Sequence, residues 1–88
     1  YGLTSQLRRC SVSIPSNISE GFGRFHNKDY KRFLFICLGS CAEATTQLII
    51  SQRLNYIDES RMNVLVDKIE QISKMIGSLI KKLDANER

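Results

Sequence analysis

Tryptophan is absent from this 88-residue chain, and proline and histidine each occur only once. Aromatic residues make up 8% of the sequence, which does not indicate a carbohydrate-binding pocket or an aromatic stacking pocket. No run of about 18 apolar residues is present, so we expect no membrane span. No charged and then apolar leader precedes a small-residue cleavage site, so we expect no secretion signal and a cytoplasmic protein.

Cysteine is scarce and odd in number: Cys10, Cys37 and Cys41 each lie among apolar neighbours. Cys37 and Cys41 are four residues apart on an expected helix and therefore share a face. A metal or redox pair is one interpretation, but zinc needs four ligands and the lone histidine, His26, lies in an expected loop. We expect buried, reduced thiols, because free cysteine behaves as a small hydrophobic residue, and no metal or other cofactor.

Length and charge set further bounds. A chain of 88 residues allows one small domain whose core is marginal by itself, so a partner subunit would help. The chain starts at Tyr1 without a methionine, and we expect an N-terminal piece to be missing. The net charge of +4 is a mild basic excess, not the dense cluster of an obligate nucleic-acid-binding protein.

The apolar spacing predicts an all-α protein, with helices over about residues 3–21, 28–54 and 59–84 and no strand-like alternation. In the first of these, apolar side chains recur every three or four residues, at Leu3, Leu7, Cys10, Ile14 and Ile18. Gly21 and Gly23 follow, where glycine can take the left-handed conformation that ends a helix.

The second expected helix is apolar on both sides. Opposite its main apolar face lie Phe35, Leu38, Ala42 and Ile49. This helix is therefore expected to be central or to meet another subunit. We predict Asn27 as its N-cap and a close packing contact at Gly39 and Ser40.

The third expected helix carries the most regular apolar stripe, with intervals of three and four at Met62, Leu65, Ile69, Ile72, Ile76, Leu79 and Leu83. Before it, we predict a left-handed cap conformation at Asn55 and a helix N-cap at Asp58. Because two other helices precede it through short loops, bundle packing is favoured over an isolated coiled coil.

Five blocks of residues carry a family resemblance: Tyr1 to Arg9, Ser13 to Arg24, Arg32 to Leu34, Gly39 to Glu43 and Thr46 to Leu48. Together with the apolar heptads of the third expected helix, the resemblance extends over essentially all of the chain. In this order and spacing they resemble the bacterial four-helix-bundle family named for open reading frames inside 23S rRNA intervening sequences. The accessory variability determinant proteins of diversity-generating retroelements resemble the same family.

The resemblance implies an antiparallel up-down four-helix bundle that forms a single domain over residues 1–88. The family's first helix, which precedes the block at Tyr1, is expected to be missing here, or its place to be taken by a neighbouring subunit. The resemblance also implies a homo-oligomeric ring, often a pentamer. The retroelement relatives bind reverse transcriptase and RNA, and no enzymatic activity comes with the family.

Basic residues are the candidates for contact with phosphate: Arg8, Arg9, Arg24, Lys28, Lys31 and Arg32. The last four lie within nine residues of one another, with His26 as a pH-sensitive addition. Phe25 and Tyr30 could stack on unpaired bases. Alternatively, the basic residues are a solvated helix end and both aromatic residues belong to the core.

Two carboxylates, Glu20 and Glu43, lie amid apolar positions, where a neighbouring pair could perform acid-base chemistry. No nucleophile beside a histidine, phosphate-binding glycine loop or metal-ligand spacing accompanies them, so we expect no catalytic residue and no enzyme. Glu20 lies eleven residues after Arg9, and Glu43 eleven residues after Arg32. We expect these to be buried ion pairs that fix the register of the helices.

Two functions follow from these patterns. The first is an oligomeric protein that binds structured RNA through a basic surface, with or without a protein partner. The alternative is a protein-interaction scaffold in which the helix over residues 28–54 forms subunit contacts and the charge serves only solubility.

Overall fold

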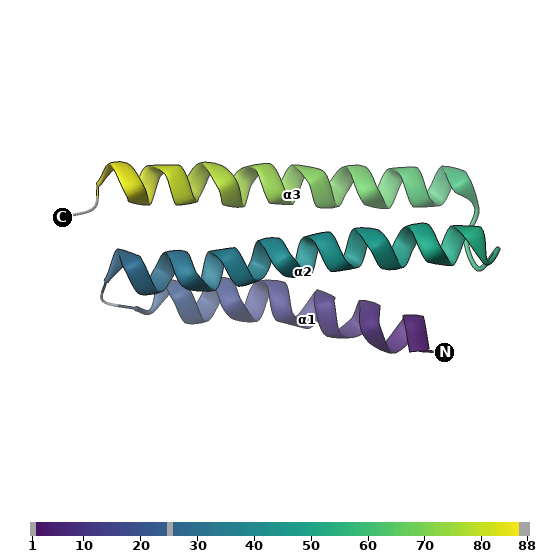
Figure 1. Cartoon of the computed structure of the whole chain (residues 1–88), viewed down its shortest axis with the longest axis horizontal. Coiled ribbons are helices and arrows are strands. Elements are labelled where there is room, and N and C mark those ends of the chain that lie inside the picture. Colours follow the sequence, from purple (N-terminus) through teal and green to yellow (C-terminus); the bar gives the residue numbers. More distant parts are fainter. Residues whose placement is uncertain (1, 25, 87–88) are drawn as a thin grey trace.

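Three antiparallel helices make up the computed structural model, which describes residues 2–24 and 26–86 (Figure 1). They are α1 (Gly2–Phe22), α2 (Asn27–Arg53) and α3 (Glu59–Ala85), each within one residue of its predicted bounds. The described residues contain no strand, so the prediction of an all-α protein is confirmed. The four-helix arrangement stays a prediction.

The middle helix, α2, packs against both of the others. Within the described ranges, no Cα atom of α1 lies within 8 Å of a Cα atom of α3. Helices that share one neighbour without touching each other occupy diagonal corners of a bundle. Because α1 and α3 do not meet, they leave part of α2 uncovered in the gap between them.

The end of α1 is fixed by close packing at Gly21. A Cβ atom built on Gly21 would lie 2.8 Å from Cδ1 of Tyr30 and 2.9 Å from Cβ of Phe33, so only glycine fits there. The predicted left-handed glycine is wrong, because no glycine among the described residues has a positive φ. Gly21 instead lets α1 approach the first turns of α2 closely.

The helix caps are partly as predicted. Asn55 has a φ of 63°, and the Asp58 side chain accepts a hydrogen bond from the backbone N–H of Arg61 at 2.7 Å, so both predictions are confirmed. Asn27 is not an N-cap: His26 takes that position with extended backbone. The Asn27 side chain donates to the carbonyl oxygen of Leu83 at 3.5 Å, which connects α2 to the end of α3.

The buried core lies along α2, where Leu34, Cys37 and Cys41 are covered by residues of α1 and α3. Ile76 and Ile80 of α3 complete the buried cluster. Partly buried side chains pack around it, at Ile14, Ile18, Tyr30, Leu38, Ile69, Leu79 and Leu83. All three cysteines are buried free thiols, which confirms the prediction of buried thiols.

The opposite side of α2 is apolar, as predicted, but it is exposed in this structure: of the residues predicted there, Phe35 and Ala42 are exposed, whereas Ile49 is half-buried and Leu38 packs against the core. Phe35, Ile36 and Ile50 lie there with exposed side chains. No atom lies within 4 Å of a Cβ atom built on Gly39, so the predicted close contact at this glycine is wrong. Its neighbour Ser40 does meet α1, where its Oγ lies 3.0 Å from that of Ser13.

By length and composition alone, α2 could also cross a membrane. The core helix of a soluble protein passes the same test, so this property is weak evidence of a span. In this structure both flanking helices pack against α2.

An open apolar groove of about 600 Å³ lies between α1 and α3. Ala44 and Leu48 of α2 line it between the two walls. Both walls are mainly apolar, with Leu7 and Ile14 from α1 and Leu65, Ile69 and Ile72 from α3. Two cations, Arg8 and Lys68, also line the groove, one from each wall.

Candidate nucleic-acid interface

The six basic candidates lie at two separate places. Arg8 and Arg9 are in the first half of α1, whereas Arg24, Lys28, Lys31 and Arg32 surround the connection from α1 to α2. Because a helix rises about 1.5 Å per residue, the stretch of α1 from Arg9 to its end near Arg24 is about 20 Å long. The structure therefore brings four of the six together and leaves two apart.

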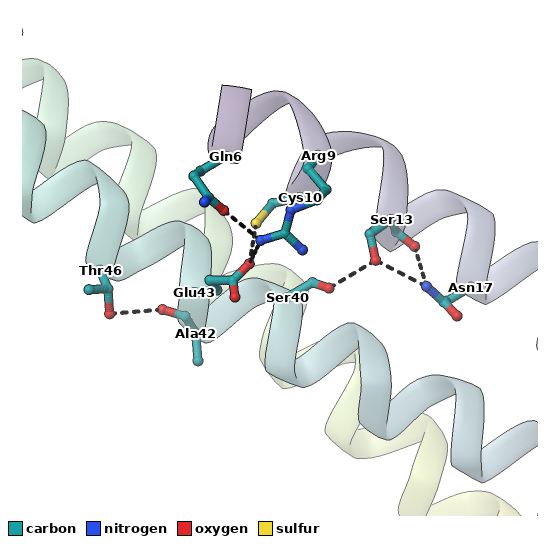
Figure 2. A network of polar contacts seen from close by, with 9 residues as sticks. All are labelled: Gln6, Arg9, Cys10, Ser13, Asn17, Ser40, Ala42, Glu43 and Thr46. Carbon is teal, nitrogen blue, oxygen red and sulfur yellow. Dashed lines mark hydrogen bonds and ion pairs between the residues drawn. The ribbon is translucent and has the colours of Figure 1, made fainter. Parts of the chain in front are cut away.

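Arg9 belongs to a polar network between α1 and α2 (Figure 2). Its Nη2 donates to Oε1 of Glu43 at 2.7 Å and to Oε1 of Gln6 at 2.5 Å. The same Glu43 oxygen accepts a hydrogen bond from Sγ of Cys10 at 3.3 Å. Further along, Ser13 Oγ accepts from the amide of Asn17 at 3.0 Å and also meets Ser40. These contacts engage Arg9 within the protein.

The predicted ion pairs join the wrong partners. Arg9 pairs with Glu43, and Glu20 pairs with Arg24 at 3.2 Å. Arg9 and Glu20 share a helix, and eleven residues of helix separate them by about 16 Å, so a shared face does not bring them into contact. The pairs are also not buried, since the side chains of Arg9 and Glu43 are 60% and 44% exposed.

Two arginines meet one aromatic ring at the α1–α2 end. The Cζ atoms of Arg24 and Arg32 lie 4.8 Å and 4.7 Å from the centroid of the Phe33 ring. Cations at this distance are attracted to the ring electrons, which restrains both guanidinium groups near each other. Arg24 is restrained further by Glu20, while Arg32 has no ion pair with a described residue. This role of Phe33 was not predicted from the sequence, although Phe33 directly follows Arg32 along the chain.

The two lysines of this end differ in exposure and in ion pairing. Lys31 is held to Asp84 by an ion pair of 2.5 Å between Nζ and Oδ1, and its side chain is only 16% exposed. Lys28 is exposed and forms no ion pair within residues 2–24 and 26–86. Because Asp84 belongs to the last turn of α3, Lys31 ties that turn to the start of α2. Arg24 is also exposed but is paired with Glu20, so we use the term accessible cations for Lys28 and Arg32, which are exposed and have no ion pair within the described residues.

Of the two expected stacking residues, only Tyr30 is among the described residues, and it does not offer a free ring for stacking. Phe25 lies outside the described residues. Tyr30 packs against the core and against Gly21, with its ring edge-on to Phe22 at 6.2 Å between centroids. The interpretation of Tyr30 as a core residue is therefore the correct one.

An open pocket of about 720 Å³ lies near the start of α2, and its lining includes both accessible cations. The members are Lys28, Asp29, Lys31, Arg32, Phe35 and Ile36. The sequence predicted Phe35 only as part of a second apolar face, and it gave no role to Ile36. The signal that could have identified them is their spacing from Lys28 and Arg32, which places all four on one side of the helix.

The fold and this end define the class: a helical-bundle protein whose first two helices meet at a basic, partly aromatic end. Residues 1–78 match the model of the family described as 23S rRNA-intervening sequence protein, so the chain belongs to that family. No curated protein matches the chain.

Proposed function

We propose that this family member is a non-enzymatic, oligomeric helical-bundle protein that binds structured RNA or another nucleic acid. The observation that carries the proposal is the pair of accessible cations, Lys28 and Arg32, beside the restrained guanidinium of Arg24. Phosphate groups are bound by cations that converge from one surface, and these three come from one end of the bundle. The name of the family, which refers to 23S rRNA, points to the same class of ligand.

The other candidates have supporting roles in this proposal. Glu20 and Glu43 orient Arg24 and Arg9, respectively. Lys31 contributes its charge from a fixed position beside Asp84. Arg8 and Arg9 lie apart from this site in the first half of α1, where Arg9 is paired with Glu43 and Arg8 lines the groove between α1 and α3.

We further propose that a fourth helix occupies the groove between α1 and α3. In this structure α1 and α3 lie at diagonal corners on either side of α2. The fourth corner of a four-helix bundle would then be open, and the apolar groove is at that corner. The expected first helix of the family would fill it, supplied by a longer chain or by a neighbouring subunit. Arg8 and Lys68 at the groove favour an occupant with acidic side chains flanking its apolar stripe.

The test of the main proposal is binding to a fluorescein-labelled RNA hairpin, measured by anisotropy between 50 and 300 mM salt. We expect the logarithm of the affinity to fall linearly with the logarithm of the salt concentration, because bound cations release counterions from the RNA. Lys28→Glu combined with Arg32→Glu is expected to abolish binding.

The matched control is Arg61→Glu combined with Lys74→Glu, which makes the same change of net charge on α3. It is expected to weaken binding much less. Equal losses in the two double variants would show that only net charge matters and would reject a site at the α1–α2 end. No binding by the unaltered protein at 50 mM salt would reject nucleic-acid binding itself.

The scaffold function is a second candidate because of the exposed side of α2. Exposed apolar side chains at Phe35, Ile36 and Ile50 spread along this helix, and such faces mark contacts between proteins. Under this alternative, α2 forms the contacts of a homo-oligomer, with five subunits favoured. Light scattering measures the mass directly: a pentamer that Ile50→Lys dissociates, together with no binding of RNA at 50 mM salt, supports the scaffold, and a monomer argues against it.

A further inference from the structure

The open pocket at the start of α2 contains an unusually placed aromatic ring. The Phe35 side chain is 58% exposed, although phenylalanine normally buries its ring. Beside it, Ile36 is also exposed. Phe35 is the aromatic residue that lines this pocket among the described residues, since Tyr30 is packed in the core and Phe33 is contacted by two guanidinium groups.

The charge around the ring is mainly positive. Lys28 and Arg32 lie one helical turn apart and have no ion pair with any residue in the described ranges. Lys31, the third cation of the pocket, is bound to Asp84. Asp29 adds one carboxylate to the lining, which repels phosphate but can accept hydrogen bonds from amino groups on a base.

We propose that this pocket binds unpaired nucleotides of an RNA strand, with a base stacked on Phe35 and the adjoining phosphates beside Lys28 and Arg32. The inference rests on the proposed function and specifies the form of nucleic acid that the site selects. An aromatic ring can stack only on a base whose face is free, which requires a single-stranded loop, bulge or end. The faces of the bases in a duplex are covered by their neighbours.

One exposed ring, with cations about one and two helical turns before it on the same helix, favours a nucleotide over an acidic peptide. A helical peptide of that kind buries an apolar stripe several turns long, whereas the apolar residues of this pocket are the two neighbours Phe35 and Ile36. A nucleotide combines a planar apolar face with a negative phosphate, and the pocket offers an aromatic ring and two cations, Lys28 and Arg32, on the same side of α2. The acidic peptide is therefore an outcome of the test.

The experiment compares a fluorescein-labelled 12-nucleotide oligouridylate with a 12-base-pair RNA duplex, using anisotropy with the whole 88-residue chain. We expect tighter binding to the single strand. Phe35→Ala is expected to weaken binding of the oligouridylate by about 5- to 100-fold, the usual range for one stacked base. Binding of the duplex is expected to change little, because its contacts are to phosphate.

The matched controls separate stacking from other effects. Phe35→Leu keeps the apolar volume without the ring and is expected to lose nearly as much affinity as Phe35→Ala. Phe22→Ala removes another exposed ring at the same end, outside the pocket, and is expected to bind normally. Circular dichroism checks that each variant is folded. A Phe35→Leu variant that binds like the unaltered protein would overturn the stacking proposal.

A spectroscopic measurement reports stacking directly, because the chain contains no tryptophan. Phe35→Trp places the sole indole in the pocket, and its fluorescence is expected to be quenched when oligouridylate stacks on it. Met75→Trp, at an exposed site on α3, serves as the control and is expected to show no quenching.

The outcomes distinguish this inference from the proposed function. If the unaltered chain binds the RNA hairpin with the expected salt dependence but Phe35→Ala binds oligouridylate normally, the function stands and the Phe35 site is wrong. If neither RNA binds at 50 mM salt, both fail. If RNA does not bind but an acidic, leucine-rich helical peptide binds and Phe35→Ala prevents it, the pocket is a protein-binding site.

Discussion

Arg9 on α1 and Glu43 on α2 form the ion pair that joins the middle of these two helices, with 2.7 Å between Nη2 and Oε1. The same carboxylate oxygen accepts a hydrogen bond from the Cys10 thiol at 3.3 Å, and the Arg9 guanidinium also donates a hydrogen bond to Gln6 (Figure 2). One acceptor on α2 thus fixes two successive residues of α1. The register of the two helices depends on this point as well as on apolar packing.

Removing the carboxylate is expected to have a modest effect on stability. Both side chains are about half exposed, so water screens their attraction, and exposed pairs contribute about 0–1 kcal/mol. A double-mutant cycle of Arg9→Gln and Glu43→Gln, measured by urea unfolding, is expected to give a coupling in this range. The same cycle with Glu20→Gln and Arg24→Gln is the control, because this ion pair joins residues four apart in the sequence and does not link two helices. A coupling above about 2 kcal/mol would show that the pair between the helices is desolvated.

Adding one methyl group at Gly21 is expected to destabilise the protein by about 1–3 kcal/mol, because the space is filled by Tyr30 and Phe33. Gly39→Ala is the matched control. No atom lies within 4 Å of its added methyl, and alanine favours the helix, so stability is expected to rise by about 0.5–1 kcal/mol. Urea unfolding measures both. Equal effects of the two substitutions would contradict the close packing at Gly21.

Local features of the fold could be predicted from the sequence because they depend on neighbouring residues. Apolar spacing determined the three helices, and the chemistry of Asp58 and Asn55 determined how α3 begins and α2 ends. Such features need no knowledge of what lies across the bundle. The N-cap of α2 was misplaced by one residue, because Asn27 finds a partner on α3 that local sequence does not reveal.

Contacts between helices could not be predicted in the same way. A shared helical face suggested Arg9 and Glu20 as partners, but only the placement of α2 beside α1 shows that Glu43 is within reach. The requirement for glycine at Gly21 likewise comes from Tyr30 and Phe33 on another helix. For the candidate site, the four basic residues around the α1–α2 connection could be found from their closeness in sequence. The exposure of Phe35, which completes the pocket, could not.

Alkaline pH is expected to destabilise the protein through its buried thiols. Burial raises the pKa of Cys10 and of Cys37 above the ordinary value of 9.0, and for Cys10 the hydrogen bond to Glu43 raises the pKa further. Unfolding therefore releases these thiol protons once the pH exceeds about 9. The stabilisation is fully present below that pH and is lost as the pH rises through the higher, folded-state pKa values.

The measurement is the free energy of unfolding between pH 7 and pH 10 in the presence of a reducing agent. A decrease above about pH 9 is expected, and the variant with Cys10→Ala and Cys37→Ala should show a smaller slope over the same interval, whatever its stability at pH 7. An unchanged slope in that variant would assign the alkaline destabilisation to other groups, such as tyrosines and lysines.

The groove between α1 and α3 is expected to be covered in the assembled protein. Ile72 lines this groove and is 39% exposed in this structure, while Met75 is exposed on the same helix outside the groove. A cysteine introduced at either position can be labelled with a thiol reagent, since the three native cysteines are buried and react slowly. If a fourth helix fills the groove, Ile72→Cys should react about tenfold or more slowly than Met75→Cys. Equal rates would show an open groove and reject a fourth helix at this place. Protection that disappears on dilution would identify a neighbouring subunit as the source of that helix, and protection that requires residues before Tyr1 would identify a longer chain.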